Sequence, residues 1–154
     1  GEQSAATTVH ALFNHIITNW TSARDYHHLR FRDHFGTDLP IAADVVLRQA
    51  VFNLLDNAAE ASPTGIDVSL GRHGDLLELV VQDDGTGFPA EQLANLGKPY
   101  NSSKGELGHG LGLFLVGNVA RKLGGELTAR NIDRGAEVTL WFPLDAISLG
   151  EKHG

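Results

Sequence analysis

Residues 76–87 read Leu-Leu-Glu-Leu-Val-Val-Gln-Asp-Asp-Gly-Thr-Gly. The apolar part of this stretch predicts a strand that delivers Asp83 at its end. Gly85 and Gly87 allow the backbone to turn tightly just beyond it. A buried carboxylate at such a position can accept a hydrogen bond from the exocyclic amine of adenine, whereas guanine presents a carbonyl there. A tight turn with solvated aspartates is the alternative interpretation of the same residues.

The rest of the chain predicts an α/β fold with a mixed, mostly antiparallel sheet covered by helices on one face. Helical periodicity marks residues 8–24, 44–61 and 111–123, and a short helical turn is expected at 90–95. Further strands are expected at 27–33, 66–71, 126–132 and 136–142. We divide the chain into three parts. Residues 1–26 form a helical segment that packs on or leads into the domain, residues 27–147 form the domain itself, and residues 148–154 form a disordered tail.

Composition narrows the class of protein. The chain has 154 residues, a formal net charge of −7 and no cysteine. The length suits one domain with a core, the charge argues against a general nucleic-acid binder, and the lack of cysteine excludes disulfides and thiolate chemistry. No apolar run is long enough to span a membrane. We expect a cytoplasmic domain without membrane contact, which leaves room for an anchor elsewhere in a longer parent protein.

Two asparagines lie on a polar face of the helix expected at 44–61. Asn53, Asn57 and Glu60 follow the i, i+4, i+7 spacing that places side chains on one side of a helix. A solvated helix face is the common explanation, yet asparagine is a mediocre helix former. An asparagine carbonyl can complete the oxygen shell of a Mg²⁺ ion that ATP phosphates already hold.

A second glycine run leads into the helix expected at 111–123. Gly108, Gly110 and Gly112 line its N-terminus, where free N–H groups and the helix dipole favour a phosphate. Leu113 stands where a dinucleotide fingerprint needs its third glycine, and no P-loop lysine follows. A flexible linker is the alternative.

The segment before this run is expected to be mobile and to close over a ligand. Residues 97–109 have little periodicity. Within them, Lys104 can neutralise a terminal phosphate, and Ser102 and Ser103 can donate hydrogen bonds.

The order of these motifs resembles that of sensor histidine kinases over about residues 27–143. Five stretches match. They are the N box (Asn53–Ala58), the G1 box (Asp83–Gly87), the F box with its following serine and lysine (Lys98–Lys104), the G2 box (Gly108–Leu113) and the last strand (Gly135–Pro143). The resemblance implies the Bergerat-type two-layer α/β sandwich of the histidine-kinase and Hsp90-like ATPase superfamily, often abbreviated GHKL. Some details resemble the redox-responding branch of these kinases.

The resemblance also implies a role for each matching residue. Asn57 would be the Mg²⁺ ligand, Asn53 would line the metal and phosphate side, and Asp83 would contact adenine. Gly85 and Gly87 would flank the base, and Thr139 would back it through Asp83 or a water. The phosphates would be held by Lys104, Ser102, Ser103 and the run Gly108, His109, Gly110, Leu111, Gly112 and Leu113.

Three departures from the family pattern lead us to expect modest ATP affinity. Glu60 replaces a frequent basic residue, and Ala61 replaces the aromatic that often stacks on adenine. The arginine often seen in the segment over the phosphates is missing.

The implied function is that of an ATP–Mg²⁺-binding catalytic domain. It would donate the γ-phosphoryl group to a histidine on a separate dimerisation domain, for relay to a response regulator. His10, His15 and His27 lack the acidic residue and proline that follow the acceptor histidine in this family. We therefore expect a monomeric fragment that is inactive without the acceptor domain, from a homodimeric parent.

Two alternatives remain. ATP-hydrolysing relatives place a glutamate where this chain has Asn53, and asparagine cannot act as a general base, which favours transfer to histidine over hydrolysis. A non-catalytic nucleotide-binding module is the other alternative.

Overall fold

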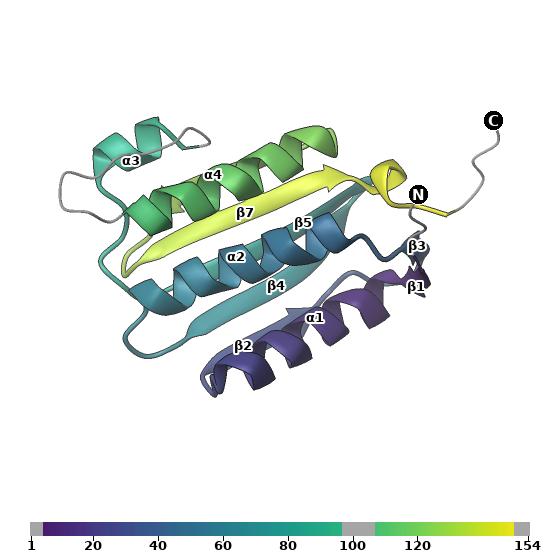
Figure 1. Ribbon diagram of the computed structural model, residues 1–154, viewed down its shortest axis with the longest axis horizontal. Coiled ribbons are helices and arrows are strands. Elements are labelled where there is room, and N and C mark those ends of the chain that lie inside the picture. Colours follow the sequence, from purple (N-terminus) through teal and green to yellow (C-terminus); the bar gives the residue numbers. More distant parts are fainter. Residues whose placement is uncertain (1–4, 97–106, 150–154) are drawn as a thin grey trace.

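A five-stranded sheet forms one layer of the molecule (Figure 1). The computed structural model describes residues 5–96 and 107–149, with side chains in the second range from Gly112 onward. In spatial order the strands are β2 (Leu29–Asp33), β4 (Ile66–His73), β5 (Leu76–Asp83), β7 (Ala136–Pro143) and β6 (Glu126–Asn131). β2 runs parallel to β4, and the other neighbours are antiparallel. The predicted mixed, mostly antiparallel sheet is confirmed.

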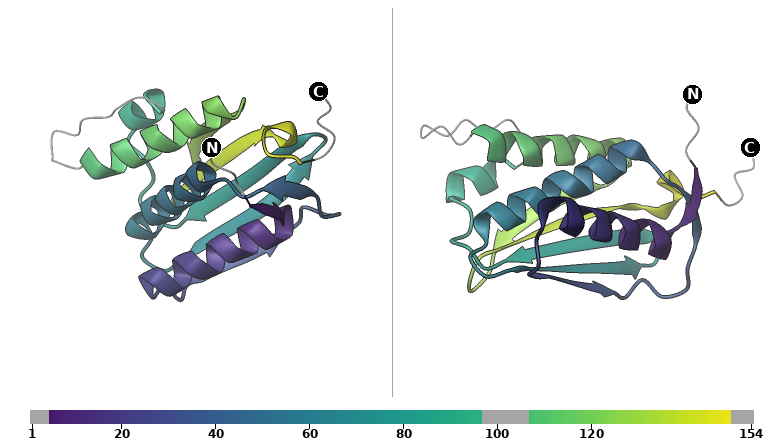
Figure 2. Two further views of the ribbon diagram at one scale, coloured as in Figure 1. Left: turned by 45° about the vertical axis from the view of Figure 1, so that its right-hand side comes forward. Right: turned by 60° about the horizontal axis from the view of Figure 1, so that its bottom comes forward.

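Three long helices cover one face of this sheet (Figures 1 and 2). They are α1 (Val9–Arg24), α2 (Val45–Ala61) and α4 (Leu107–Lys122), and a short helix, α3 (Ala90–Ala94), precedes α4. Asp44 caps α2, because its carboxylate accepts hydrogen bonds from the backbone N–H groups of Val46 and Leu47, at 2.7 and 3.1 Å. The two-layer sandwich expected from the sequence is therefore present.

The core lies between the helices and the covered face of the sheet. Side chains of β5 alternate, so that Leu77, Leu79 and Val81 are buried against the helices while the residues between them face away. Asp83 continues the buried series and is the single buried polar residue among those the structure describes. The alternation of β5 therefore carries a carboxylate into the apolar layer.

Two short strands were not predicted from the sequence. β1 (Ala6–Thr8) pairs with β3 (Pro40–Ala42), where a break was expected at residues 38–40. Three-residue strands contain too few side chains to show a period of two, so the sequence pattern does not reveal them. A 3-10 helix, η1 (Leu144–Ala146), follows β7.

The two ends of the predicted domain contact the rest of the fold. Phe13, Ile16 and Trp20 of α1, in the helical segment expected to pack on or lead into the domain, belong to the same apolar core as the sheet. Ser148 forms a bridge with Ile41, so the first residue of the expected tail is paired with β3. Residues 150–154 lie outside the described part. Among the described helices, none has both the length and the hydropathy needed to cross a membrane.

Candidate functional site

Asp83 ends β5 with one carboxylate oxygen engaged and one available. Its side chain is 8 % exposed, and Oδ1 accepts hydrogen bonds from the backbone N–H groups of Gly85 and Ala136, at 2.9 and 3.3 Å. No described residue donates to Oδ2. Burial raises the pKa of Asp83, an effect that the two N–H donors oppose and the neighbouring charge of Asp84 reinforces. A held carboxylate with a free oxygen is suited to receive an amine from a ligand.

Gly85 brings the loop after β5 into direct contact with the end of α2. A Cβ atom at this position would lie 2.1 Å from the carbonyl oxygen of Ala61, a distance that excludes every side chain. Gly135 has φ +100° and would place a Cβ 1.9 Å from the carbonyl oxygen of Asp83. Glycine at both positions therefore lets α2, β5 and the turn before β7 converge on Asp83.

The remainder of the glycine loop is fixed by Asn131 of β6. Its Oδ1 accepts a hydrogen bond from the backbone N–H of Phe88 at 2.8 Å, and its Nδ2 donates to the Phe88 carbonyl at 3.0 Å. Gly87, with φ +83°, lies against the same carboxamide. The sequence interpretation missed Asn131, because nothing local marks an asparagine 43 residues away as the partner of this loop.

The two asparagines of α2 differ in how they are bonded. Both are partly buried. Oδ1 of Asn53 accepts a hydrogen bond from Nε2 of Gln49 at 3.2 Å, one turn earlier in the helix. The carboxamide of Asn57 has no hydrogen-bond partner among the described residues. Asn57 thus offers a free carbonyl oxygen, the neutral ligand that a magnesium–phosphate complex can use.

Asp84 joins the end of β5 to the turn after α2, a role that the sequence interpretation did not assign. Its carboxylate accepts hydrogen bonds from the hydroxyl groups of Ser62 and Thr64. These two bonds lower the pKa of Asp84 to about 2, so the carboxylate is ionised at neutral pH. The bond to Ser62 spans 22 positions in the chain, which explains why no local pattern revealed it.

Thr139 does not lie beside Asp83, so its predicted role is wrong. Thr139 pairs with Val80 of β5 and Thr128 of β6, and the alternation of β7 turns its side chain to the face without helices. Asp83 points to the opposite, covered face. The residue of β7 that contacts Asp83 is Ala136, through its backbone N–H.

The predicted phosphate-binding residues are described only in part. Ser102, Ser103 and Lys104 lie outside the described residues, as do the side chains of His109 and Leu111. α4 begins at Leu107 rather than at 111, so the run from Gly108 to Gly112 lies within its first turns. The side chain of Leu113 is 2 % exposed and packs in the core, which leaves its backbone for any ligand contact.

The N-terminus of α4 lies at the same end of the sheet as the C-terminus of α2 (Figure 1). Ala61, the last residue of α2, is exposed there. The first N–H groups of a helix have no partner within it, so this end of α4 carries backbone donors at the end of the sheet where α2 ends. The loop after Asp83, the C-terminus of α2 and the N-terminus of α4 therefore lie at one end of the molecule.

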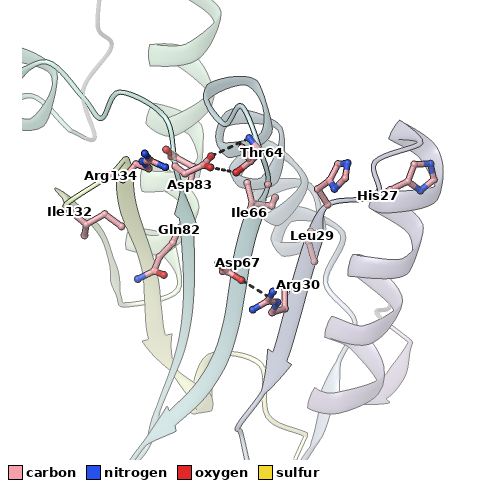
Figure 3. A pocket seen from close by; sticks show the side chains of 13 residues that line it. His27, Leu29, Arg30, Thr64, Ile66, Asp67, Gln82, Asp83, Ile132 and Arg134 are labelled. Atoms are coloured by element: carbon pink, nitrogen blue, oxygen red, sulfur yellow. Dashed lines mark hydrogen bonds and ion pairs between the residues drawn. The ribbon is translucent and has the colours of Figure 1, made fainter.

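A pocket of about 620 Å³ lies at the ends of the strands, beside this region (Figure 3). Its lining includes Arg30, Asp67 and Gln82 from the face without helices, together with Thr64 and Asp83. The Arg30 Nε atom is 3.8 Å from Oδ1 of Asp67. Neither asparagine lines the pocket, so it is separate from the asparagine face and shares Asp83 alone with the predicted site residues.

The sequence of this chain is similar to one protein family and to several sensor kinases. Residues 43–146 match the family described as histidine kinase-, DNA gyrase B-, and HSP90-like ATPase. The chain is 37 % identical over 115 residues to histidine protein kinase DivJ of Caulobacter vibrioides, covering 70 % of this chain and 19 % of that protein. It is 32 % identical over 145 residues to sensor histidine kinase ZraS of Escherichia coli O157:H7, covering 91 % and 31 %. The chain therefore spans less than a third of either relative.

The fold of this chain is similar to that of solved histidine kinase structures. A mycobacterial sensor histidine kinase, MprB, is 26 % identical and superposes with a TM-score of 0.69, over 91 % of this chain and 97 % of that one. The catalytic domain of histidine kinase ThkA, in a nucleotide-free form, has a TM-score of 0.73 at 20 % identity, over 92 % and 97 %. The second likeness concerns the fold alone.

Proposed function

The chain belongs to the family of histidine kinase-, DNA gyrase B- and HSP90-like ATPases, and we propose that it is the ATP-binding catalytic domain of a sensor histidine kinase. The observation that carries the proposal is Asp83. Its carboxylate is held in the covered layer by Gly85 and Ala136, and its Oδ2 is left for the amine of adenine. Guanine would bring a carbonyl to the same oxygen, which is repulsive.

The phosphate side of the nucleotide would be bound by groups at the ends of α2 and α4. Asn57 would contribute its carboxamide oxygen to Mg²⁺, which neutralises part of the charge on the phosphates when bound. Lys104 and the backbone N–H groups at the start of α4 would bind the phosphate oxygens. Asn53 lies one helical turn before Asn57 and would line the same side.

Transfer to a histidine is favoured over hydrolysis by the residue at position 53. An asparagine carboxamide cannot accept a proton from water, and its Oδ1 already accepts a bond from Gln49. Glu60 follows Asn57 instead of preceding it, so it does not occupy the position of a water-activating glutamate. The domain would therefore act by positioning and charge neutralisation, and the nucleophile would come from another domain.

Two of the described histidines have ring nitrogens engaged with neighbouring groups of the chain. Both ring nitrogens of His10 are engaged, Nδ1 with Asp33 and Nε2 with the carbonyl of Gly36. Nε2 of His27 lies 2.9 Å from Oδ1 of Asp25. The partners we propose are a histidine-bearing dimerisation domain and, indirectly, a response regulator, within a homodimeric parent kinase.

Calorimetric titration with ATP, ADP and GTP, each with and without Mg²⁺, tests the nucleotide site. We expect ATP to bind about ten- to a hundredfold more tightly than GTP, the factor for one lost hydrogen bond to a charged group. Asn57→Ala should remove the gain in affinity that Mg²⁺ provides. Equal affinity for ATP and GTP would contradict the role of Asp83.

A phosphoryl-transfer assay tests the reaction. The chain should label the histidine of a separately produced dimerisation domain of its own kinase from γ-labelled ATP, and it should hydrolyse ATP only slowly when alone. Several turnovers per second by the chain alone would instead identify a hydrolytic enzyme.

A further inference from the structure

The C-terminal end of α1 contacts α2 through one carboxylate. Nε and Nη2 of Arg24 donate to Oδ1 and Oδ2 of Asp56, at 2.8 and 2.9 Å. Nε1 of Trp20 donates to Oδ1 of Asp56 at 2.9 Å. We call these three residues the α1–α2 clamp. The fork of the guanidinium meets both carboxylate oxygens, a geometry that fixes direction as well as distance.

A second contact extends the clamp along α2. The guanidinium carbon of Arg24 lies 5.8 Å from the ring centroid of Phe52, within the range of a cation–π interaction. Phe52 and Asp56 are four residues apart and therefore share one side of the helix. Arg24 thus holds α2 at two points, one turn apart.

The clamped residues immediately precede the two candidate asparagines. Phe52 comes before Asn53, and Asp56 comes before Asn57. Consecutive residues differ by about 100° around a helix, so the asparagine face adjoins the clamped side. Any rotation of α2 about its axis, or slide along it, that the clamp prevents would also move the carboxamide of Asn57.

The clamp is anchored in the core. Trp20 is 1 % exposed, and its ring packs on Tyr26 with a centroid distance of 5.2 Å. Burial alone would raise the pKa of Asp56, but the hydrogen bonds from Arg24 and Trp20 outweigh it and lower that pKa. The carboxylate is therefore ionised at neutral pH and keeps both donors engaged.

We propose that Arg24 and Asp56 are positioning residues that aim Asn57 at the metal side of the nucleotide site. The inference rests on the proposed function, because it concerns the same asparagine. Neither residue is among the ligand contacts of the proposed function. They act through α2, and a displacement of α1 would be transmitted through Asp56 to the asparagine face.

The test is the gain in ATP affinity that Mg²⁺ provides, measured as the ratio of dissociation constants in EDTA and in Mg²⁺. Arg24→Gln should reduce this ratio by roughly threefold to tenfold, the size of a coupling through a packed element, and leave the affinity in EDTA unchanged. Arg24→Lys keeps the charge without the fork and should restore part of the ratio.

Arg130→Gln is the matched control. Nε of Arg130 donates to Oε1 of Glu137 at 2.8 Å, so the variant loses the same kind of ion pair, on β6 and β7 and away from α2. It should leave the ratio at the wild-type value. Trp20→Phe removes a single donor to Asp56 and keeps an aromatic, although smaller, ring in the core, so it serves as a second variant if Arg24→Gln does not fold.

The outcomes separate the two proposals. If Arg24→Gln and Trp20→Phe lower the melting temperature but keep the wild-type ratio, the clamp is structural only and this inference is overturned. If Asn57→Ala also keeps the wild-type ratio, the metal assignment in the proposed function fails. If Asn57→Ala loses the ratio while both clamp variants keep it, the clamp inference alone is wrong.

Discussion

The carboxylate of Asp84 accepts a hydrogen bond from the hydroxyl group of Ser62, so the end of β5 is tied directly to the turn after α2. Asp83, the candidate adenine contact, is the neighbour of Asp84, and α2 carries the candidate metal ligand Asn57. One carboxylate therefore joins the two parts of the site that would recognise opposite ends of the nucleotide. Asp84 does this without lying in the covered layer itself.

Asp84→Ala is expected to lower the melting temperature and weaken ATP binding. The variant removes the acceptor for both hydroxyl groups, so the end of α2 loses its tie to β5. Asp133→Ala is the control, because Asp133 is an exposed aspartate with no hydrogen-bond partner among the described residues. Scanning calorimetry and ATP titration measure the two effects. Equal melting temperatures for the two variants would contradict a role for Asp84.

ATP affinity is expected to fall as the pH is lowered toward the raised pKa of Asp83. Its raised pKa means that the carboxylate takes up a proton at a pH above that of an ordinary aspartate, near 3.9. A protonated oxygen no longer offers a charged acceptor to the adenine amine. The same raised pKa has the opposite effect on the stability of the fold. Because the folded state binds this proton more tightly than the unfolded state, Asp83 adds stability at low pH, and this stability is lost as the pH rises through the folded pKa.

A variant at position 83 serves as the control for protonation of the ATP phosphates, which affects both proteins equally. Asp83→Asn should bind ATP weakly, and the ratio of its dissociation constant to that of the wild type should shrink as the pH is lowered from neutrality to the lowest pH at which both proteins stay folded. A ratio that stays constant over this range would show that Asp83 does not titrate in the nucleotide site.

Gly85→Ala is expected to destabilise the fold and to reduce ATP binding. The new methyl group would lie 2.1 Å from the carbonyl oxygen of Ala61, so α2 and the loop after β5 must separate. Overpacking of this kind costs about 1–3 kcal/mol. Gly71→Ala is the matched control, because no described atom lies within 4 Å of its added Cβ. Denaturant unfolding compares the two, and equal free energies of unfolding would refute the close contact.

The helices and the longer strands could be predicted because their signals are local. Asp44 bonds the N–H groups two and three residues ahead of it, and the apolar stripe of α2 repeats every turn, so both lie within a short stretch of sequence. The position of Asp83 at the end of a strand could be predicted for the same reason, since it follows an apolar stretch and precedes its own glycine loop.

Contacts between distant segments could not be predicted in this way. Arg24 and Asp56 are 32 positions apart, and Phe88 and Asn131 are 43 apart. The error at Thr139 has a related cause. A one-residue shift in strand alternation reverses the face that a side chain occupies, and the sequence of β7 alone does not say which residue meets Asp83.

The stability of the fold is expected to decrease as pH rises above neutrality because of His10. Nδ1 of His10 faces the carboxylate of Asp33, and Nε2 faces the carbonyl of Gly36 at 2.6 Å, so both nitrogens must carry a proton to satisfy both acceptors. These bonds, with the charge of Asp38 nearby, raise the pKa of His10. A raised pKa means stability that is complete below the unfolded pKa near 6.5 and is lost as the pH rises through the folded pKa.

His10→Gln should remove the fall in melting temperature between pH 6 and 9, whereas His15→Gln, on the exposed side of the same helix, should leave the wild-type dependence of melting temperature on pH. A slope that persists in His10→Gln would assign the pH dependence to another group.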